Sequence, residues 1–381
     1  MRYTFPHYFD YFHCTAAECE DTCCAGWAIM IDDNSLQKYK AMEGTFGKRV
    51  KDSINWEEGS FHQCNGRCAF LNDDNLCDMH MYGGEEMLCD TCRNYPRHME
   101  EYEGLREGSL SLSCIEAAKI ILGCHEPVKF ITLEDDIEDE EYEDFDFLLF
   151  TKLMDAREYM LNILQDRTVD VRIRMAKVLD LAQKIQEKIE TESIGDIDDL
   201  LVKTEDDESK NKQTLGENDY YTIMRKWIRT LKQLEVLKSD WPEYLKKAEW
   251  NLYGVGWATY EEKRKQFHKE IELDNQDSWS ACMEQLIVYF IYVYFCGAVY
   301  DGEVLSKVQL AIVSTMIIRE LIFAVWLQED EISFEDIVDV AHKYSREVEH
   351  SDVNLGRMEK ILSENEQFSC KKIMDVLLYK C

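Results

Sequence analysis

Cysteines are the residues of this chain whose type and spacing point most directly to chemistry. Of the 15 cysteines, 11 lie in the first 124 residues. Thiolates bind zinc and iron–sulfur clusters well, and short spacings let one turn place two sulfurs on a single centre. Although a single buried cysteine is more often an inert small hydrophobe, this density predicts a metal centre. The pattern runs Cys14-x4-Cys19-x3-Cys23-Cys24, then Cys64-x3-Cys68-x8-Cys77-x11-Cys89-x2-Cys92, then Cys114 and Cys124.

The identity of the metal is left open by the spacing. Zinc competes with an iron–sulfur cluster, because four histidines in the same region could add ligands: His13, His62, His80 and His98. The adjacent pair Cys23-Cys24 is awkward for one tetrahedral zinc ion, since neighbouring side chains tend to diverge. A disulfide framework would need an oxidising compartment. We expect this half of the chain to be unstable without its metal, because little apolar core is available to it.

The same residues resemble a known family. The order Cys14-x4-Cys19-x3-Cys23-Cys24-x-Gly26-Trp27 resembles the N-terminus of the flagellin lysine-N-methylases. Further shared elements are Cys68-Ala69-Phe70-Leu71, Leu76-Cys77, Leu88-Cys89-Asp90-Thr91-Cys92, Arg93-Asn94-Tyr95-Pro96-Arg97 and Leu112-Ser113-Cys114-Ile115-Glu116-Ala117-Ala118. The match covers about residues 3–120, and some elements also occur in a broader group of zinc- or iron-chelate-binding cysteine-cluster proteins. Ile115 departs from the pattern, which has proline at that position.

The resemblance implies an enzyme that transfers a methyl group from S-adenosylmethionine to lysine side chains of flagellin. It also implies a [4Fe-4S] cluster held by these cysteines. The ligands it implies, in decreasing order of preference, are Cys19, Cys23, Cys68, Cys77, Cys89 and Cys92, then Cys14, Cys24 and Cys114, with Cys64 in third place. Cys124 and the four C-terminal cysteines are expected to be structural. Whether one or two clusters form is left open.

Two arginines follow the last cysteine pair. Arg93 and Arg97 could donate hydrogen bonds to cluster sulfurs or to a carboxylate of the methyl donor. An ordinary ion pair in a very acidic protein is an equal alternative for them. For Gly26-Trp27, loop packing over the metal site is the favoured interpretation.

Other signatures of methyl-transfer chemistry are missing. The radical-SAM pattern Cys-x3-Cys-x2-Cys does not occur, and no glycine-rich loop follows an apolar strand with an acidic residue. Gly254-Val255-Gly256 is interpreted as a turn between helices. The donor site and the catalytic residues therefore cannot be located from the sequence.

The elements that must position these cysteines divide the chain in two. We expect a mainly α fold: a loop-rich cysteine-cluster domain over residues 1–130, an acidic linker over 131–146 and an α-helical domain over 147–381. Helical spacing of apolar residues recurs after residue 150, as in Met175, Val178, Leu179 and Ala182. Two buried helices are predicted over 280–299 and 304–328, joined by a turn at residues 300–302. The polar segment 203–218 is predicted to be a loop.

Composition excludes some classes of function. Lys and Arg number 43 against 76 Asp and Glu, a formal charge of −33, so binding to nucleic-acid phosphates is not expected. No membrane partner is expected, since the longest apolar run, Leu286–Val299, is too short to span a bilayer. No export signal is recognised at the start, so we expect a cytoplasmic protein. The negative charge could attract a lysine-bearing partner, although it more often only maintains solubility.

Two functions from different classes remain at this point. The first is cluster-dependent methylation of flagellin lysines. The alternative is a non-catalytic iron–sulfur or zinc module acting in electron transfer or as an interaction scaffold. A donor pocket and a protein-sized groove, expected at the domain boundary, would distinguish them.

Overall fold

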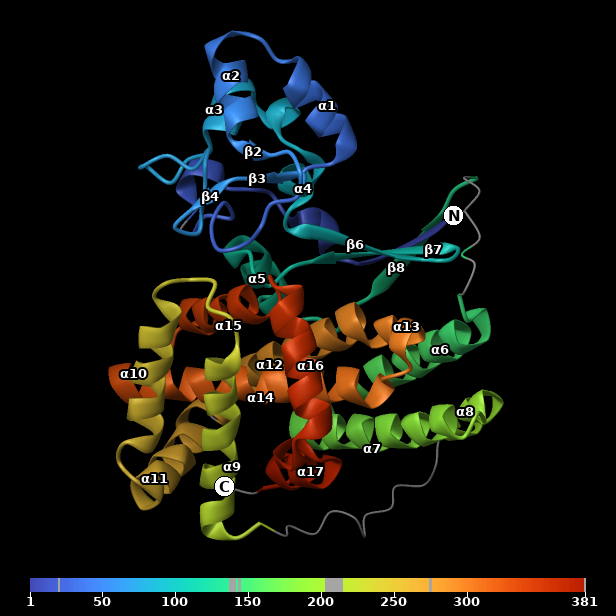
Figure 1. Ribbon diagram of the computed structural model, residues 1–381. Coiled ribbons are helices and arrows are strands. Elements are labelled where there is room, and N and C mark those ends of the chain that lie inside the picture. The colour runs from blue at the N-terminus through green and yellow to red at the C-terminus, as the bar shows by residue number, and fades with distance from the viewer. Residues whose placement is uncertain (20, 137–141, 143–144, 203–214, 274–275, 380–381) are drawn as a thin grey trace.

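The computed structural model describes residues 1–19, 21–136, 142, 145–202, 215–273 and 276–379 (Figure 1). A small cysteine-rich lobe lies above a larger helical body, and a narrow sheet extends from the region between them. The predicted fold class is confirmed: the chain is mainly helical, with small sheets in its cysteine-rich part.

The small lobe consists of short elements joined by loops. Its helices and strands are α1 (Asp33–Ala41), α2 (Gly44–Asp52), α3 (Asp78–Gly83), α4 (Asp90–Asn94), β2 (Ile54–Asn55), β3 (Ser60–Phe61), β4 (Gln63–Cys64) and β5 (Arg67–Cys68). Its hydrophobic core is small and contains Tyr39, Phe61, Phe70 and two of the cysteines. A core of this size stabilises a fold only weakly on its own.

A four-stranded sheet connects the lobe to the helical body. Its strand order is β6 (Arg97–Tyr102), β7 (Leu105–Leu110), β1 (Arg2–Pro6) and β8 (Phe130–Glu134). β1 runs parallel to β7 and antiparallel to β8. Residues 131–134, predicted to begin an acidic linker, therefore belong to a strand: the run Ile-Thr-Leu-Glu alternates apolar and polar residues and pairs with β1.

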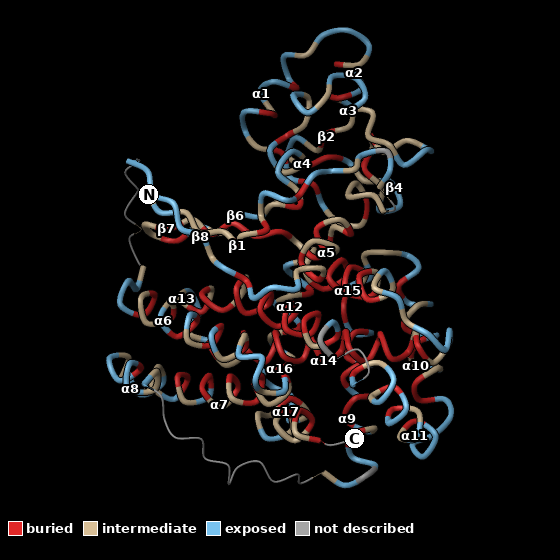
Figure 2. Tube along the Cα trace, turned by 180° about the vertical axis from the view of Figure 1, so that it is seen from behind, coloured by how far each residue is buried: buried red, intermediate tan, exposed pale blue. Residues whose placement is uncertain are grey.

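The helical body holds the larger core. Its helices are α5 (Ile115–Leu122), α6 (Phe147–Leu164), α7 (Val171–Glu190), α8 (Ile197–Leu201), α9 (Glu217–Thr230), α10 (Trp241–Tyr253), α11 (Trp257–Phe267), α12 (Gln276–Tyr294), α13 (Ala298–Asp301), α14 (Val304–Glu329), α15 (Phe334–Val348), α16 (Asp352–Glu364) and α17 (Cys370–Leu377). Figure 2 shows that buried residues concentrate on α12 and α14, at the centre of this body. The helices start where expected from capping: Asp146, Asp170 and Ser333 accept hydrogen bonds from the first turns of α6, α7 and α15.

Two predicted features of this body are confirmed. The two buried helices are α12 and α14. The first ends at Tyr294, earlier than predicted, and α13 follows over Ala298–Asp301, so within the predicted turn only Gly302 leaves the helix, in a left-handed conformation. Ser278–Asp301 and Val304–Glu329 are long and apolar enough to cross a membrane, but 78% and 89% of their most apolar windows are buried inside the protein. The residues 254–256 form the turn between α10 and α11, as predicted.

The boundary between the two hydrophobic cores differs from the boundary between the cysteine-rich and cysteine-poor parts of the sequence. Residues of β7, α5 and the segment after β1, such as Phe12, Leu105 and Ile121, pack in the same core as the C-terminal helices. The division into domains at residues 130 and 146 stays a prediction. Most of the acidic run 134–146 and of the polar segment 203–218 lies outside the described residues; of the described part, Asp146 caps α6 and residues 217–218 begin α9.

Candidate functional site

Five of the predicted ligands line one small cavity in the small lobe. Its volume is about 10 Å³, room for about one water-sized atom. The rest of its wall is apolar and includes Tyr39, Phe61, Phe70 and Met79. The thiols are those of Cys24, Cys68, Cys77, Cys89 and Cys92.

Short elements bring these thiols together from four segments of the chain. Cys77 and Cys89 precede the first turns of α3 and α4, and Cys92 lies one turn after Cys89. Cys68 ends β5, and its backbone N–H donates to the carbonyl of Cys24 at 2.9 Å. The loop that carries Cys24 is thereby fixed to the hairpin that carries Cys68.

The cavity thiols differ in acidity. A hydrogen bond from Cys24 lowers the pKa of Cys77 to about 6, against the effect of burial, with help from the backbone N–H groups of residues 79 and 80. Burial raises the pKa of Cys68 to about 11. Cys89 receives a hydrogen bond from Cys92, which lowers the pKa of Cys89 against the effect of burial.

The remaining predicted ligands do not line this cavity. A hydrogen bond from Cys24 lowers the pKa of Cys23, and a negative charge on the nearby Cys77 acts in the opposite direction. Cys19 and Cys114 interact electrostatically with Cys23 but pack against the larger core. Cys14 and the third-ranked Cys64 are exposed.

The donor set fits a thiolate-bound metal in type and location. Soft sulfur ligands from several segments surround one small space, as in sites that zinc or iron–sulfur chemistry folds. Among the described residues, however, no three Cys, His, Asp or Glu side chains already have the geometry of ligands to one ion. A four-iron cluster is larger than the cavity, so these thiols would have to rotate outward around it. None of His13, His62, His80 and His98 lines the cavity.

Arg93 and Arg97 make contacts of their own. Arg93 pairs with Asp90 at 3.0 Å and donates to the carbonyl of Leu88 at 2.9 Å, which braces the turn before Cys89. Arg97 donates to the carbonyl of Phe12 at 2.9 Å and lies 5.0 Å from the centre of that ring. Arg93 thus forms an ordinary ion pair, one of the two alternatives that the sequence left open. A contact of Arg93 or Arg97 with a cofactor stays a prediction.

Asp21 binds the loop that carries Cys19, Cys23 and Cys24 to the helical body. Its carboxylate contacts Lys238 Nζ at 2.9 Å and His342 Nε2 at 2.9 Å, and Arg346 at 3.5 Å. Burial would raise the pKa of Asp21, but these three partners together hold it well below its usual range. A charge-assisted cluster of this kind fixes the loop between Cys19 and Cys23 against α15.

A ring cluster lies beside these contacts of Asp21. Trp27 packs edge-on against His350, with ring centres 5.0 Å apart, and Tyr95 contacts both rings at 5.8 and 5.6 Å. Ser113 accepts or donates hydrogen bonds with Tyr95 and His350. Residues of the family-like motifs therefore meet the C-terminal end of α15. Trp27 packs against this interface, and its predicted packing over a metal site stays a prediction.

Sequence reasoning missed the residues of the helical body at this interface. These residues are spaced four apart on α15 and just beyond its C-terminal end: His342, Arg346 and His350. Such spacing is typical of any polar helix face. Asp21 stands between two predicted ligands and could have been noted for its position. Nothing local in the sequence pairs it with residues more than 200 positions away.

A larger surface hollow of about 410 Å³ lies elsewhere, among α7, α14, α16 and α17. Its lining includes Glu190, Glu303, Glu364 and Cys370. Neither this hollow nor the thiol cavity lies at the predicted domain boundary, so the donor pocket expected there stays a prediction.

Comparison with known proteins identifies relatives. The family model described as the FliB lysine N-methylase C-terminal domain matches residues 157–376. The chain is 31% identical over 128 residues to the lysine-N-methylases of Salmonella choleraesuis and Salmonella typhimurium, which is 31% of this chain and 32% of each relative. It is 30% identical over 128 residues to the flagellar biosynthetic protein FliU of Salmonella muenchen, covering 76% of that protein. No solved structure matches the chain.

The aligned part spans about a third of the length of the two lysine-N-methylases. The family model covers more than half of the present chain, through the helical body that sequence patterns matched only in character. The predicted family is thus confirmed: this chain belongs to the FliB lysine N-methylase family.

Proposed function

We propose that this protein transfers methyl groups from S-adenosylmethionine to lysine side chains of flagellin. The observation that carries the proposal is the match of the helical body to the FliB lysine N-methylase family. The names of the relatives, a lysine-N-methylase and a flagellar biosynthetic protein, support lysine as the acceptor and a flagellar protein as the partner. We also propose a cytoplasmic location, where the thiols would stay reduced.

The second part of the proposal is a [4Fe-4S] cluster in the small lobe. The thiols of Cys24, Cys68, Cys77, Cys89 and Cys92 would hold it, with Cys23 beside them. Their gathering around one cavity supports a bound metal, and the resemblance of residues 3–120 favours iron over zinc. When bound, the cluster would offer an iron to which the amino and carboxylate groups of the methyl donor could bind.

The chain itself must meet the demands of methyl transfer to lysine. The ammonium has an ordinary pKa of about 10.4, so it must lose a proton before its nitrogen can attack the methyl carbon. Aromatic faces stabilise a sulfonium and an approaching ammonium. Trp27 donates to the carbonyl of Cys23, and Tyr95 packs against Trp27, so both rings lie near Cys23 at the interface. The formal charge of −33 would attract a lysine-bearing partner.

The test begins with anaerobic purification of the full-length protein. Iron, acid-labile sulfide and zinc are measured first, and the protein is then incubated with S-adenosylmethionine and flagellin. Mass increments of one methyl group on flagellin lysines support the enzyme. A metal-loaded protein that methylates no flagellin would instead favour the non-catalytic metal module, and zinc in place of iron would refute the cluster.

A further inference from the structure

Arg346 holds the turn that carries two of the predicted ligands. Its Nη1 donates to the carbonyl of Thr22 at 3.0 Å, and its Nη2 donates to the carbonyl of Ala25. These two carbonyls lie immediately before and after Cys23 and Cys24. One guanidinium from α15 therefore grips both ends of the cysteine pair.

The other two carbonyls of this turn are bound within the cysteine-rich half. The carbonyl of Cys23 accepts from Trp27 Nε1 at 2.7 Å, and that of Cys24 accepts from the N–H of Cys68 at 2.9 Å. All four carbonyls from residue 22 to residue 25 are thus satisfied. Among the residues that the structure describes, Arg346 provides the hydrogen bonds that connect these carbonyls to the helical body.

The site is built for an arginine. The side chain is 4% exposed and also lies 3.5 Å from the Asp21 carboxylate. Gly26 follows the turn with a φ of +89°, and a Cβ there would stand 3.7 Å from the guanidinium. A planar fork reaches two carbonyls at once, whereas a lysine offers one point charge on a flexible stem.

We propose that Arg346 is a positioning residue that fixes Cys23 and Cys24 for metal binding and couples the metal site to α15. The inference rests on the proposed function, in that these thiols belong to a metal site. It extends that site into the helical body, which the cysteine pattern does not reach. Loss of Arg346 would leave the part-buried carbonyl of Thr22 and the buried carbonyl of Ala25 without this donor and would free the turn, while the other cysteine segments keep their own supports.

The experiment compares R346M and R346K with the wild-type full-length protein. The first measurement is the rate at which iodoacetamide alkylates each cysteine in the protein as purified, followed by mass spectrometry. We expect R346M to raise the rates at Cys23 and Cys24 about tenfold relative to those at Cys89 and Cys92. The second measurement is Co²⁺ affinity, followed by thiolate-to-cobalt absorption, which should fall about 10- to 100-fold as for other residues that orient metal ligands. R346K should lie between R346M and wild type.

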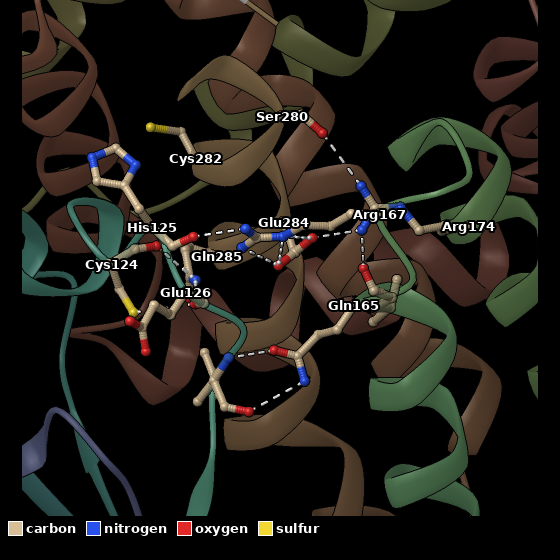
Figure 3. A network of polar contacts seen from close by, with 12 residues as sticks. Cys124, His125, Glu126, Gln165, Arg167, Arg174, Ser280, Cys282, Glu284 and Gln285 are labelled. Atoms are coloured by element: carbon tan, nitrogen blue, oxygen red, sulfur yellow. Dashed lines mark hydrogen bonds and ion pairs between the residues drawn. The ribbon is translucent and has the colours of Figure 1, made fainter. Parts of the chain in front are cut away.

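A matched control comes from the buried network in Figure 3. Arg174 is also a buried arginine, and it donates to Glu284 at 2.6 Å and to the carbonyl of Leu164, within the helical body. R174M should lower stability but leave both the alkylation ratio and the Co²⁺ affinity unchanged. If R346M does not fold, R346K is compared with R174K in the same measurements, and only R346K should raise the ratio.

The outcomes separate the two proposals. An unchanged alkylation ratio and unchanged Co²⁺ affinity in R346M would overturn the positioning role while leaving the metal site intact. If the wild-type protein binds neither iron nor Co²⁺, the proposed metal site is overturned; a raised ratio in R346M would then show only that Arg346 holds the turn, and its role in metal binding would fall with the site. Equal effects of R346M and R174M would refute the role, because the effect would then be general destabilisation.

Discussion

His350 should make the stability of this protein depend on pH in a predictable way. The imidazole lies at the interface between the two lobes, against Trp27 and Tyr95, and is hydrogen-bonded to Ser113. Burial, followed by the positive charges of Arg346 and its neighbours, lowers the pKa of His350 to about 3. The folded protein therefore keeps this histidine neutral throughout the mildly acidic range.

The sign and size follow from comparison with the unfolded chain. There the histidine has an ordinary pKa of about 6.5 and takes up a proton below it. The stabilisation is thus present above pH 6.5 and is lost as the pH falls toward 3. At pH 5 the difference from the unfolded pKa is about 1.5 units, so His350 alone should lower the free energy of unfolding by about 2 kcal/mol.

The assay is urea denaturation of wild type and H350Q at pH 8 and pH 5. The wild-type protein should lose about 2 kcal/mol more than H350Q over this range. H98Q is the control, because His98 is exposed and pairs only with a neighbouring glutamate, and it should follow wild type. Equal losses in wild type and H350Q would refute the reasoning, as would an NMR titration of His350 with a midpoint near 6.5.

Further predictions concern the buried ion network, the ligands and the charge. E284Q should lower the free energy of unfolding by about 3–5 kcal/mol, because it leaves the buried Arg174 without its counter-charge. The exposed E243Q should change it by less than about 0.5 kcal/mol, and equal urea midpoints for the two variants would contradict the reasoning. C92S should lower the iron or zinc content measured by elemental analysis, whereas C296S, a cysteine in the other core, should not; an unchanged content in C92S would remove it from the ligands. The association rate with flagellin in stopped-flow measurements should fall as salt rises, since attraction by a charge of −33 is screened, and a salt-independent rate would assign that charge to solubility alone.

Local pattern predicted the long helices well, and five of the predicted ligands line one cavity. The 3.6-residue period of α7 and the apolar runs of α12 and α14 are properties of single segments, and burial in one core follows from them directly. Cys89 and Cys92 needed only one helical turn to reach the same cavity.

The interface could not be predicted in the same way. The contacts of Asp21 join residues 21, 238, 342 and 346, and such pairing depends on how two lobes meet rather than on any local period. β8 was also missed, because its partner β1 lies more than 120 residues earlier in the chain. Residues 131–134 were assigned to the linker because they adjoin the acidic run. Their apolar and polar residues alternate, however, as in a strand.

The most direct test of the central claim is lysine methylation by the purified protein and its C24S and C77S variants. With S-adenosylmethionine and flagellin under anaerobic conditions, wild type should carry iron and sulfide and add methyl groups to flagellin lysines. Both variants should lose the metal and the methylation together. Methylation by a protein without bound iron, or a full iron complement with no methylated lysine, would contradict the account.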